Sequence, residues 1–269
     1  MEILFWCEFP EKADWAFIQR LFSQEDFRTD IFVACRSAKE LEKLRKGIKK
    51  TCPNIKQVNP WPILSESEGY WFSGFTEKES IDKLHRYSSL NIKVDLEPPY
   101  PKVGYGPARL VLYGISCFVR KTKNSSYLEN SVVKLGRNSK IISNEFPLPE
   151  FITRSWGCFI DVRKYENMEK NFIFYSTFIK RLRFMLRAYY KWFSKKAVKK
   201  YRDKVMFSLG LLGPGIFSTE PAYRKISELK KDIEIVKKAG ANKIAIYSIE
   251  RLQERERPEE WIQLLKSYL

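Results

Sequence analysis

Short apolar runs that are rich in β-branched and aromatic residues recur along the chain, and a stretch with helical spacing of apolar positions follows most of them. This alternation predicts βα units around a parallel sheet. We predict eight strands, over residues 3–7, 30–35, 55–59, 92–97, 140–143, 171–176, 205–211 and 243–248.

The helix predicted over residues 227–239 has the clearest pattern, because apolar residues recur there every three or four positions and Gly240 follows as a C-terminal cap. Further outer helices are predicted over residues 38–50, 78–87 and 258–269. Eight βα units in a chain of 269 residues match a (β/α)8 TIM barrel, for which about 250 residues are typical. We therefore predict an α/β fold with a single barrel domain over residues 1–269, in which the first and last strands pair.

Composition and charge narrow the class of protein. Hydrophobic residues make up 44% of the chain and aromatic residues 15%, so a disordered protein is excluded. The formal net charge is +17, but residues 178–204 carry eleven Lys or Arg and one Asp, and residues 119–140 carry six and one Glu. Because the rest of the chain is close to neutral, the charge belongs to two segments, which argues against nucleic acid as the partner.

Cysteine and histidine usage excludes several kinds of site. The cysteines lack a C-x-x-C pair, which predicts reduced thiols in a cytoplasmic protein; they are Cys7, Cys35, Cys52, Cys117 and Cys158. We expect no secretory signal and no membrane span, since no basic n-region precedes Glu8 and no window has 18 uninterrupted apolar residues. His85 is the single histidine, which disfavours a histidine metal site or a Ser-His-Asp triad.

We predict no cofactor and no metal, because the Walker A, G-x-G-x-x-G and H-E-x-x-H motifs are absent. The segment 210–215, with three glycines after the seventh predicted strand, is interpreted either as a plain tight loop or as a phosphate-binding loop.

Acidic and aromatic residues follow the predicted strands at equivalent positions. In a (β/α)8 barrel the C-terminal strand ends form the active site. The candidate catalytic residues there are Glu97, Asp95, Glu145, Tyr175 and Glu250, and the candidate substrate-binding residues are Glu8, Arg36, Trp61, Trp71, Tyr100 and Ser248.

The fourth predicted strand carries the most information. Apolar and charged residues alternate along it, which places Lys93, Asp95 and Glu97 on the face toward the barrel interior, where Lys93 should pair with a carboxylate. Pro98 holds Glu97 extended at the mouth. Glycoside hydrolysis needs one protonated carboxyl and a second group that stabilises or captures the oxocarbenium-like centre. Glu97 suits the first role, and either Asp95, Glu145, Glu250 or the substrate's own acetamide suits the second.

Val94-Asp95-Leu96-Glu97 resembles the end of the DxxDxDxE signature of chitinase-like (family 18) glycoside hydrolases. Leu90 and Lys93 stand where the first two aspartates of that signature lie. The resemblance implies that Glu97 is the general acid and that Asp95 positions a substrate acetamide. It also implies that Tyr175 corresponds to the tyrosine on strand six of that family. A structural ion-pair network is the alternative for these charges.

A basic, aromatic helix is predicted over residues 178–204. Its apolar face comprises Phe178, Leu182, Met185, Leu186, Tyr189 and Phe193, and its basic face comprises Lys180, Arg183, Arg187, Lys191 and Lys195. It is either the sixth barrel helix or, with Tyr190, Trp192 and Tyr201, a surface for an anionic membrane or a polyanion. The sequence thus favours a glycoside hydrolase-like enzyme acting on a poly- or oligosaccharide. The alternative is a non-catalytic basic barrel that binds such a surface.

Overall fold

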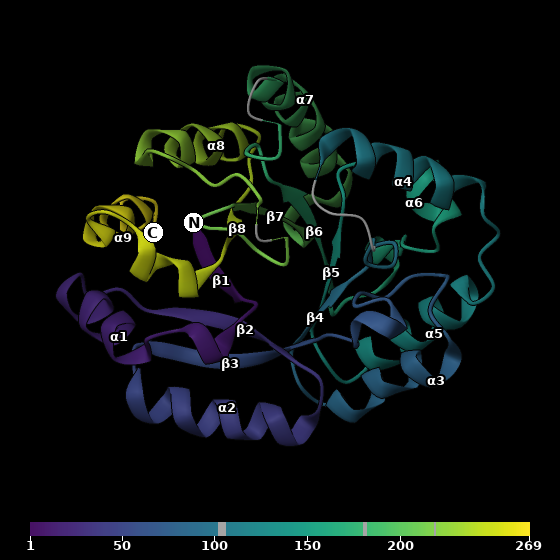
Figure 1. The fold of residues 1–269 in the computed structure, drawn as a ribbon, viewed down its shortest axis with the longest axis horizontal. Coiled ribbons are helices and arrows are strands. Elements are labelled where there is room, and N and C mark those ends of the chain that lie inside the picture. Colours follow the sequence, from purple (N-terminus) through teal and green to yellow (C-terminus); the bar gives the residue numbers. More distant parts are fainter. Residues whose placement is uncertain (102–105, 180–181, 218) are drawn as a thin grey trace.

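The computed structural model describes residues 1–101, 106–179, 182–217 and 219–269. Eight parallel strands form one sheet in the order β3-β2-β1-β8-β7-β6-β5-β4 (Figure 1). The strands are β1 (Glu2–Cys7), β2 (Thr29–Cys35), β3 (Ile55–Pro62), β4 (Ile92–Asp95), β5 (Ile141–Glu145), β6 (Met168–Phe174), β7 (Val205–Gly210) and β8 (Lys243–Tyr247).

Helices surround this sheet. They are α1 (Trp15–Gln24), α2 (Ala38–Thr51), α3 (Lys78–Ile81), α4 (Pro107–Val119), α5 (Ser125–Gly136), α6 (Glu150–Ser155), α7 (Arg183–Tyr201), α8 (Ile226–Lys238) and α9 (Pro258–Lys266). The segment predicted as a helix over residues 78–87 is α3 followed by a 3-10 helix, Asp82–Tyr87.

Pairing of the first and last strands nearly closes the sheet into a barrel. β1 pairs in parallel with β8 from Glu2 opposite Lys243 to Trp6 opposite Tyr247. Between β3 and β4 lies the segment of Tyr70 and Phe72. On the β4 side, the N–H of Phe72 donates to the carbonyl of Asp95 and its carbonyl accepts from the N–H of Glu97, each at 3.0 Å; on the β3 side, the carbonyl of Tyr70 accepts from the N–H of Leu64 at 2.9 Å. The predicted (β/α)8 fold is therefore confirmed.

Two apolar clusters result from the alternation of side chains along the strands. One fills the barrel interior with residues such as Leu4, Trp6 and Ile142. The larger one lies between the sheet and the helices and includes Ile92, Val94 and Leu96. The predicted orientation of the fourth strand is confirmed, since Lys93 and Asp95 take the interior face.

Helix α7 differs from its prediction. Residues 180 and 181, and with them Lys180 of the predicted basic face, lie outside the described residues. The buried residues of α7 are Tyr190, Ser194, Ala197 and Tyr201, whereas Leu182 and Met185, predicted to face the sheet, are exposed. Two of the predicted solvent-facing cations are in ion pairs with α8, Arg183 with Glu228 and Arg187 with Asp232. Leu186, Tyr189 and Phe193 of the predicted apolar face do pack against the core. The division into an apolar and a basic face is therefore confirmed in part.

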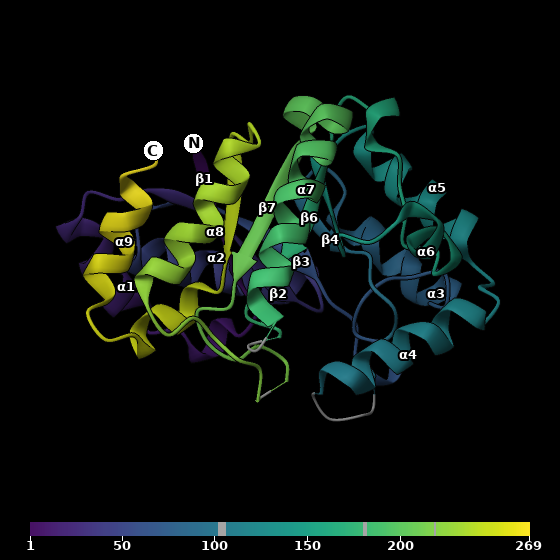
Figure 2. The same ribbon diagram turned by 90° about the horizontal axis from the view of Figure 1, so that it is seen from above.

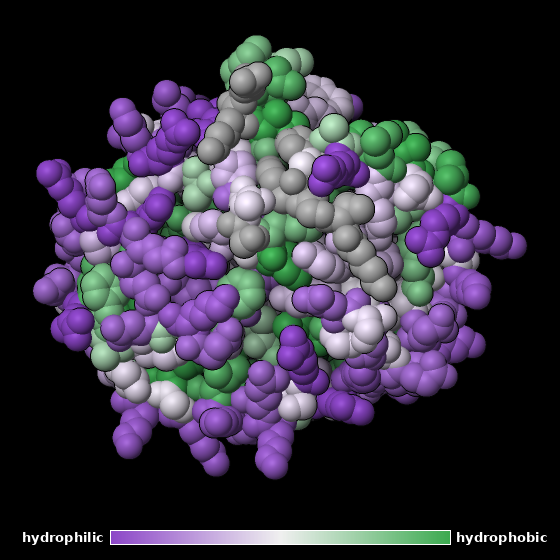
Figure 3. Space-filling view, in the orientation of Figure 1, coloured by the Kyte–Doolittle hydropathy of each residue, from purple (hydrophilic) through white to green (hydrophobic). Residues whose placement is uncertain are grey.

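Helix α4 was not predicted, and it lies at the end of the barrel toward which the strands point (Figure 2). Figure 1 looks onto this end, and in the same orientation apolar side chains gather over α4 and over the start of α7 (Figure 3). Within the described part of the chain, none of the helices combines the length and the apolar character needed to cross a membrane. All five cysteines are free and buried.

Candidate active site

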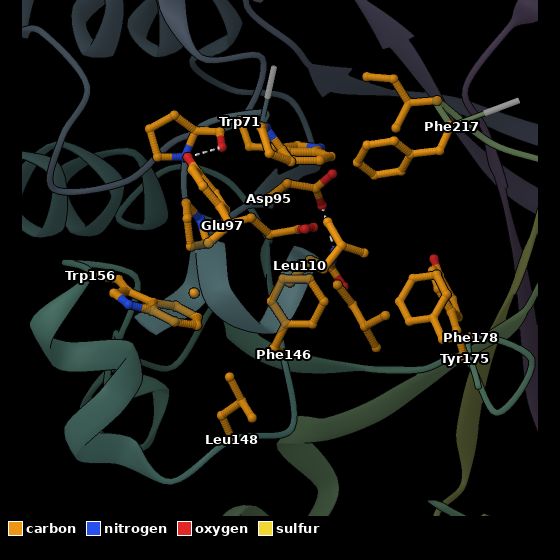
Figure 4. A pocket seen from close by; sticks show the side chains of 18 of the residues that line it. Trp71, Asp95, Glu97, Leu110, Phe146, Leu148, Trp156, Tyr175, Phe178 and Phe217 are labelled. Atoms are coloured by element: carbon orange, nitrogen blue, oxygen red, sulfur yellow. Dashed lines mark hydrogen bonds between the residues drawn. The ribbon is translucent and has the colours of Figure 1, made fainter. Parts of the chain in front are cut away.

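A cavity of about 530 Å³ opens at the C-terminal ends of the strands. Its floor is polar and comes from strand ends, and its outer wall is apolar and comes from α4, α6 and the segments beside them. Figure 4 shows Asp95 and Glu97 pointing into the cavity, with Leu110, Phe146, Leu148 and Trp156 on one side and Tyr175, Phe178 and Phe217 on the other.

A chain of hydrogen bonds inside the barrel fixes Asp95. Lys93 Nζ lies 2.6 Å from Asp95 Oδ1 and 3.2 Å from the centre of the Trp61 ring. Asn144 Nδ2 donates to the same Asp95 oxygen at 2.7 Å, and Asn144 Oδ1 accepts from Asn171. Because all these groups are buried, the carboxylate of Asp95 is held in one orientation beside a fixed positive charge.

Glu97 follows β4 and lines the cavity while remaining buried. Burial raises the pKa of its carboxyl well above the usual range, the charge of Asp95 raises it further, and Lys93 opposes the shift. Glu97 is therefore the side chain of the floor best suited to carry a proton near neutral pH.

Two further carboxyls face the same cavity. Glu8, after β1, accepts hydrogen bonds from the hydroxyls of Tyr70, at 2.9 Å, and Tyr247. Burial raises the pKa of Glu8 to about 7, against the lowering effect of these two hydrogen bonds. Glu220, in the loop after β7, accepts from the N–H of Gly215 at 2.7 Å, and burial followed by the charge of Glu8 raises its pKa to about 8.

Glu220 was missed by the sequence analysis, although the glycines before it gave a local signal. A Cβ on Gly215 would collide with the Tyr247 hydroxyl and lie 2.7 Å from Glu220 Oε2, so any other residue there would have to displace these two side chains. Since a carboxylate already accepts from the Gly215 amide, the structure supports the tight-loop interpretation of segment 210–215 over phosphate binding.

Several predicted residues do meet at the cavity. Trp61, Trp71 and Tyr175 line it together with Tyr247, which the sequence analysis missed. Tyr100 is not part of the lining; its ring stacks on Phe217 at 5.1 Å between ring centres and lies 5.9 Å from Trp71.

Besides Tyr100, four predicted residues do not line the cavity. Glu145 is on the outer face of the sheet, where it forms an ion pair with Lys170 and accepts from the N–H of Ile160 at 3.4 Å. Glu250 accepts from the N–H groups of Glu8 and Phe9, each at 3.1 Å, and so holds the chain after β1. The remaining two are Arg36, which is exposed, and Ser248, which is buried away from the lining.

The expectation that all strand-end carboxylates share one mouth is thus corrected for Glu145 and Glu250. Glu145 pairs with Lys170, and one carboxylate oxygen of Glu250 accepts the two backbone hydrogen bonds, so both side chains make structural contacts outside the cavity. Among the described residues, no group of three or more His, Cys, Asp or Glu side chains is arranged to hold a metal ion.

Comparison with solved structures identifies barrels of the same kind. The glycoside hydrolase domain of PgaB (BpsB) from Bordetella bronchiseptica matches with a TM-score of 0.60 and 9% sequence identity, over 97% of this chain and 97% of that one. A family 18 chitinase from Crocus vernus matches with a TM-score of 0.48 and 14% identity, over 98% of each chain. No protein-family model and no curated protein matches the sequence. The likeness to the PgaB domain shows that the two chains share the (β/α)8 fold.

Proposed function

We propose that the protein hydrolyses glycosidic bonds with Glu97 as the general acid. The observation that carries this proposal is a buried carboxyl with a raised pKa that faces a cavity beside a second, cation-paired carboxylate, Asp95. Two such groups in different environments are what acid-assisted glycoside cleavage requires. The fold shared with the glycoside hydrolase domain of PgaB is consistent with this chemistry.

In the proposed reaction, Glu97 gives its proton to the glycosidic oxygen as the bond between that oxygen and the anomeric carbon breaks. The anomeric carbon is captured either by an acetamide oxygen of the substrate, which Asp95 would orient, or directly by water. The Glu97 carboxylate then accepts a proton from the attacking water, which restores the acid and completes the hydrolysis.

The aromatic rings of the cavity fit a sugar substrate. Trp61, Trp71 and Tyr175 line the space beside the two carboxyls, and pyranose rings pack on aromatic faces through their C–H groups. A poly- or oligosaccharide is the substrate class proposed. The non-catalytic alternative has less support, because four carboxyls face one cavity and, in the described part of the chain, only Asp95 of these is in an ion pair.

The test is turnover of glycosides by Glu97→Gln, with the surface substitution Glu11→Gln as control. A panel of 4-methylumbelliferyl hexosides and N-acetylhexosaminides, together with the corresponding oligosaccharides, finds the sugar that the wild type cleaves. On the unactivated oligosaccharide, Glu97→Gln should lower kcat/KM by about 10² or more, since that is the usual contribution of a general acid. Full turnover by Glu97→Gln, or no cleavage of any glycoside by the wild type, would contradict the proposal.

A further inference from the structure

Helix α4 has a composition that does not suit a surface helix. Eight of the ten residues from Leu110 to Val119 are Val, Leu, Ile, Tyr, Cys or Phe. Several of them are nevertheless exposed: Val111 is 59% exposed, Leu112 66% and Val119 76%. A helix that is apolar on every side normally lies in a protein core or in contact with lipid. At 13 residues, α4 is too short to cross a bilayer.

The inner side of α4 is the outer wall of the cavity. Leu110, Gly114 and Phe118 line the same space as Glu97. Opposite them lies Trp156, which presents its six-membered ring to Gly114, and the ring of Phe151 from α6 lies 6.1 Å from that of Phe118. The apolar wall is therefore continuous with the floor that carries the carboxyls.

This wall does not suit a second sugar. Sugar hydroxyls lose their hydrogen bonds to water on burial and need polar partners in exchange. The wall contains aliphatic and aromatic side chains, and the hydroxyl of Tyr113 already donates to the carbonyl of Pro99 at 2.5 Å. A hydrocarbon chain has no polar groups that need partners, and its binding free energy becomes more favourable with every methylene group that it buries.

The outer side of α4 is flanked by positive charge. Arg109 lies in its first turn, and Arg120, Lys121 and Lys123 follow its end. Apolar side chains gather on the same face over the start of α7, where Phe184 is 71% exposed (Figure 3). An apolar patch bordered by Lys and Arg complements a lipid surface that has phosphate head groups above its hydrocarbon.

We propose that the apolar half of the cavity binds the hydrocarbon chain of an amphiphilic, lipid-type glycoside, and that the exposed side of α4 lies against the anionic lipid surface that holds this molecule. The sugar part then reaches the floor at Glu97. Cleavage of this sugar at Glu97 rests on the proposed function, whereas binding of the hydrocarbon chain does not.

Gly114 allows a direct test of the chain-binding wall. A Cβ at this position would lie 3.5 Å from Trp156 Cζ2, which is ordinary contact. Gly114→Ala should therefore be tolerated and serves as control, whereas the larger side chain of Gly114→Leu must occupy the space between α4 and Trp156. Both changes favour the helix over glycine.

The probes are n-hexyl-, n-octyl- and n-decyl-β-D-maltoside below their critical micelle concentrations, with binding followed by tryptophan fluorescence. Wild type and Gly114→Ala should bind more tightly as the chain lengthens, by up to about fourfold in Kd per buried CH₂ group. Gly114→Leu should lose at least tenfold for the decyl compound and little for the hexyl compound. Affinity that is independent of chain length, or unchanged in Gly114→Leu, would overturn the chain-binding site.

Flotation with vesicles of equal parts phosphatidylglycerol and phosphatidylcholine tests the outer side. Leu112→Ser with Val119→Ser should reduce vesicle binding at least tenfold but leave decyl maltoside binding intact, since neither residue lines the cavity. The control is Lys195→Glu with Lys196→Glu, on the exposed side of α7. Loss of binding only in this α7 control, or no binding by the wild type, would overturn the α4 contact.

These binding measurements require no turnover, so they separate the two proposals. Binding that depends on alkyl chain length, without cleavage of any glycoside, would refute the proposed hydrolase activity and support the lipid-chain site. Cleavage of oligosaccharides, together with binding that does not depend on alkyl chain length, would support the hydrolase activity and refute the lipid-chain site.

Discussion

Replacing Glu8 by glutamine should flatten the pH dependence of the protein's stability. Glu8 is 4% exposed, and the hydroxyls of Tyr70 and Tyr247 donate to its carboxylate. A glutamine has nearly the same shape: its carbonyl accepts one of these hydrogen bonds, and its NH₂ group donates to the other hydroxyl after that hydroxyl rotates. The substitution therefore chiefly removes the titratable group.

The magnitude follows from the shift in the pKa of Glu8 from its usual 4.5 to about 7. A pKa that is raised on folding means that the folded state binds the proton more tightly than the unfolded state. The stabilisation is fully present below pH 4.5 and is lost as the pH rises through 7. At about 1.4 kcal/mol per pKa unit, the wild type should lose about 3 kcal/mol of unfolding free energy across this window through Glu8 alone.

The assay is urea denaturation of wild type, Glu8→Gln and the surface control Glu11→Gln at pH 4.5, 5.5, 6.5, 7.5 and 8.5. The difference between wild type and Glu8→Gln should change by about 3 kcal/mol over this range, while Glu11→Gln should follow the wild type. Burial likewise raises the pKa values of Glu97 and Glu220, which remain in each protein; since the charge of Glu8 adds to both shifts, loss of that charge from these neighbours is part of the measured difference. Parallel curves for wild type and Glu8→Gln would refute the reasoning.

Two further substitutions test the packing that positions the cavity. Gly215→Ala should lower the unfolding free energy by about 1–3 kcal/mol, because its Cβ would have to displace two buried groups. The control is Gly47→Ala in α2, where a Cβ meets nothing within 4 Å, and thermal unfolding should show no loss of stability in this variant. Asp232→Ala should cost about 3 kcal/mol in urea denaturation, since it leaves Arg187, 2.6 Å away, without its carboxylate. An unchanged midpoint in either variant would contradict the contact concerned.

The sequence predicted the strands because they are short apolar runs rich in β-branched and aromatic residues, and it predicted the orientation of β4 because apolar and charged residues alternate along that strand. Ile92, Val94 and Leu96 can pack on the helices only if Lys93 and Asp95 point inward, and no other register buries the apolar set. Pairing of β1 with β8 followed from the number of βα units. These features depend on local pattern and on closure of the barrel, both of which are visible in one sequence.

The residues that were misplaced or missed have no such pattern. Glu220 lies in a loop ten residues after β7, where its position depends on tertiary contacts alone. Helix α4 was missed because apolar residues cover most of its circumference and leave only a narrow polar side at Arg109 and Ser116, so it lacks the broad polar face of the outer helices that were predicted. The same property that hid α4 from the sequence analysis is the basis for its proposed contact with lipid.

Glu145 shows how two residues of strand length decide whether a side chain reaches a site or packs on the outer face of the sheet. The sequence predicted that the fifth strand ends at residue 143, which left Asn144 and Glu145 both free to reach the mouth. In the structure β5 continues to Glu145, so Asn144 points into the barrel and Glu145 points to the outer face, where it meets Lys170.

If Glu145 is structural, its removal should affect stability and leave catalysis alone. Glu145→Ala leaves the ammonium of Lys170 buried without its partner, which should cost about 3–5 kcal/mol. The double variant Glu145→Leu with Lys170→Met should recover most of this loss, because it removes both charges from the same apolar surroundings. Urea denaturation gives the stabilities, and turnover per folded molecule should stay within about twofold of the wild type. A side chain on the outer face has no route to the substrate. Lower turnover at unchanged stability would therefore contradict the structural role of Glu145 and place it in the reaction.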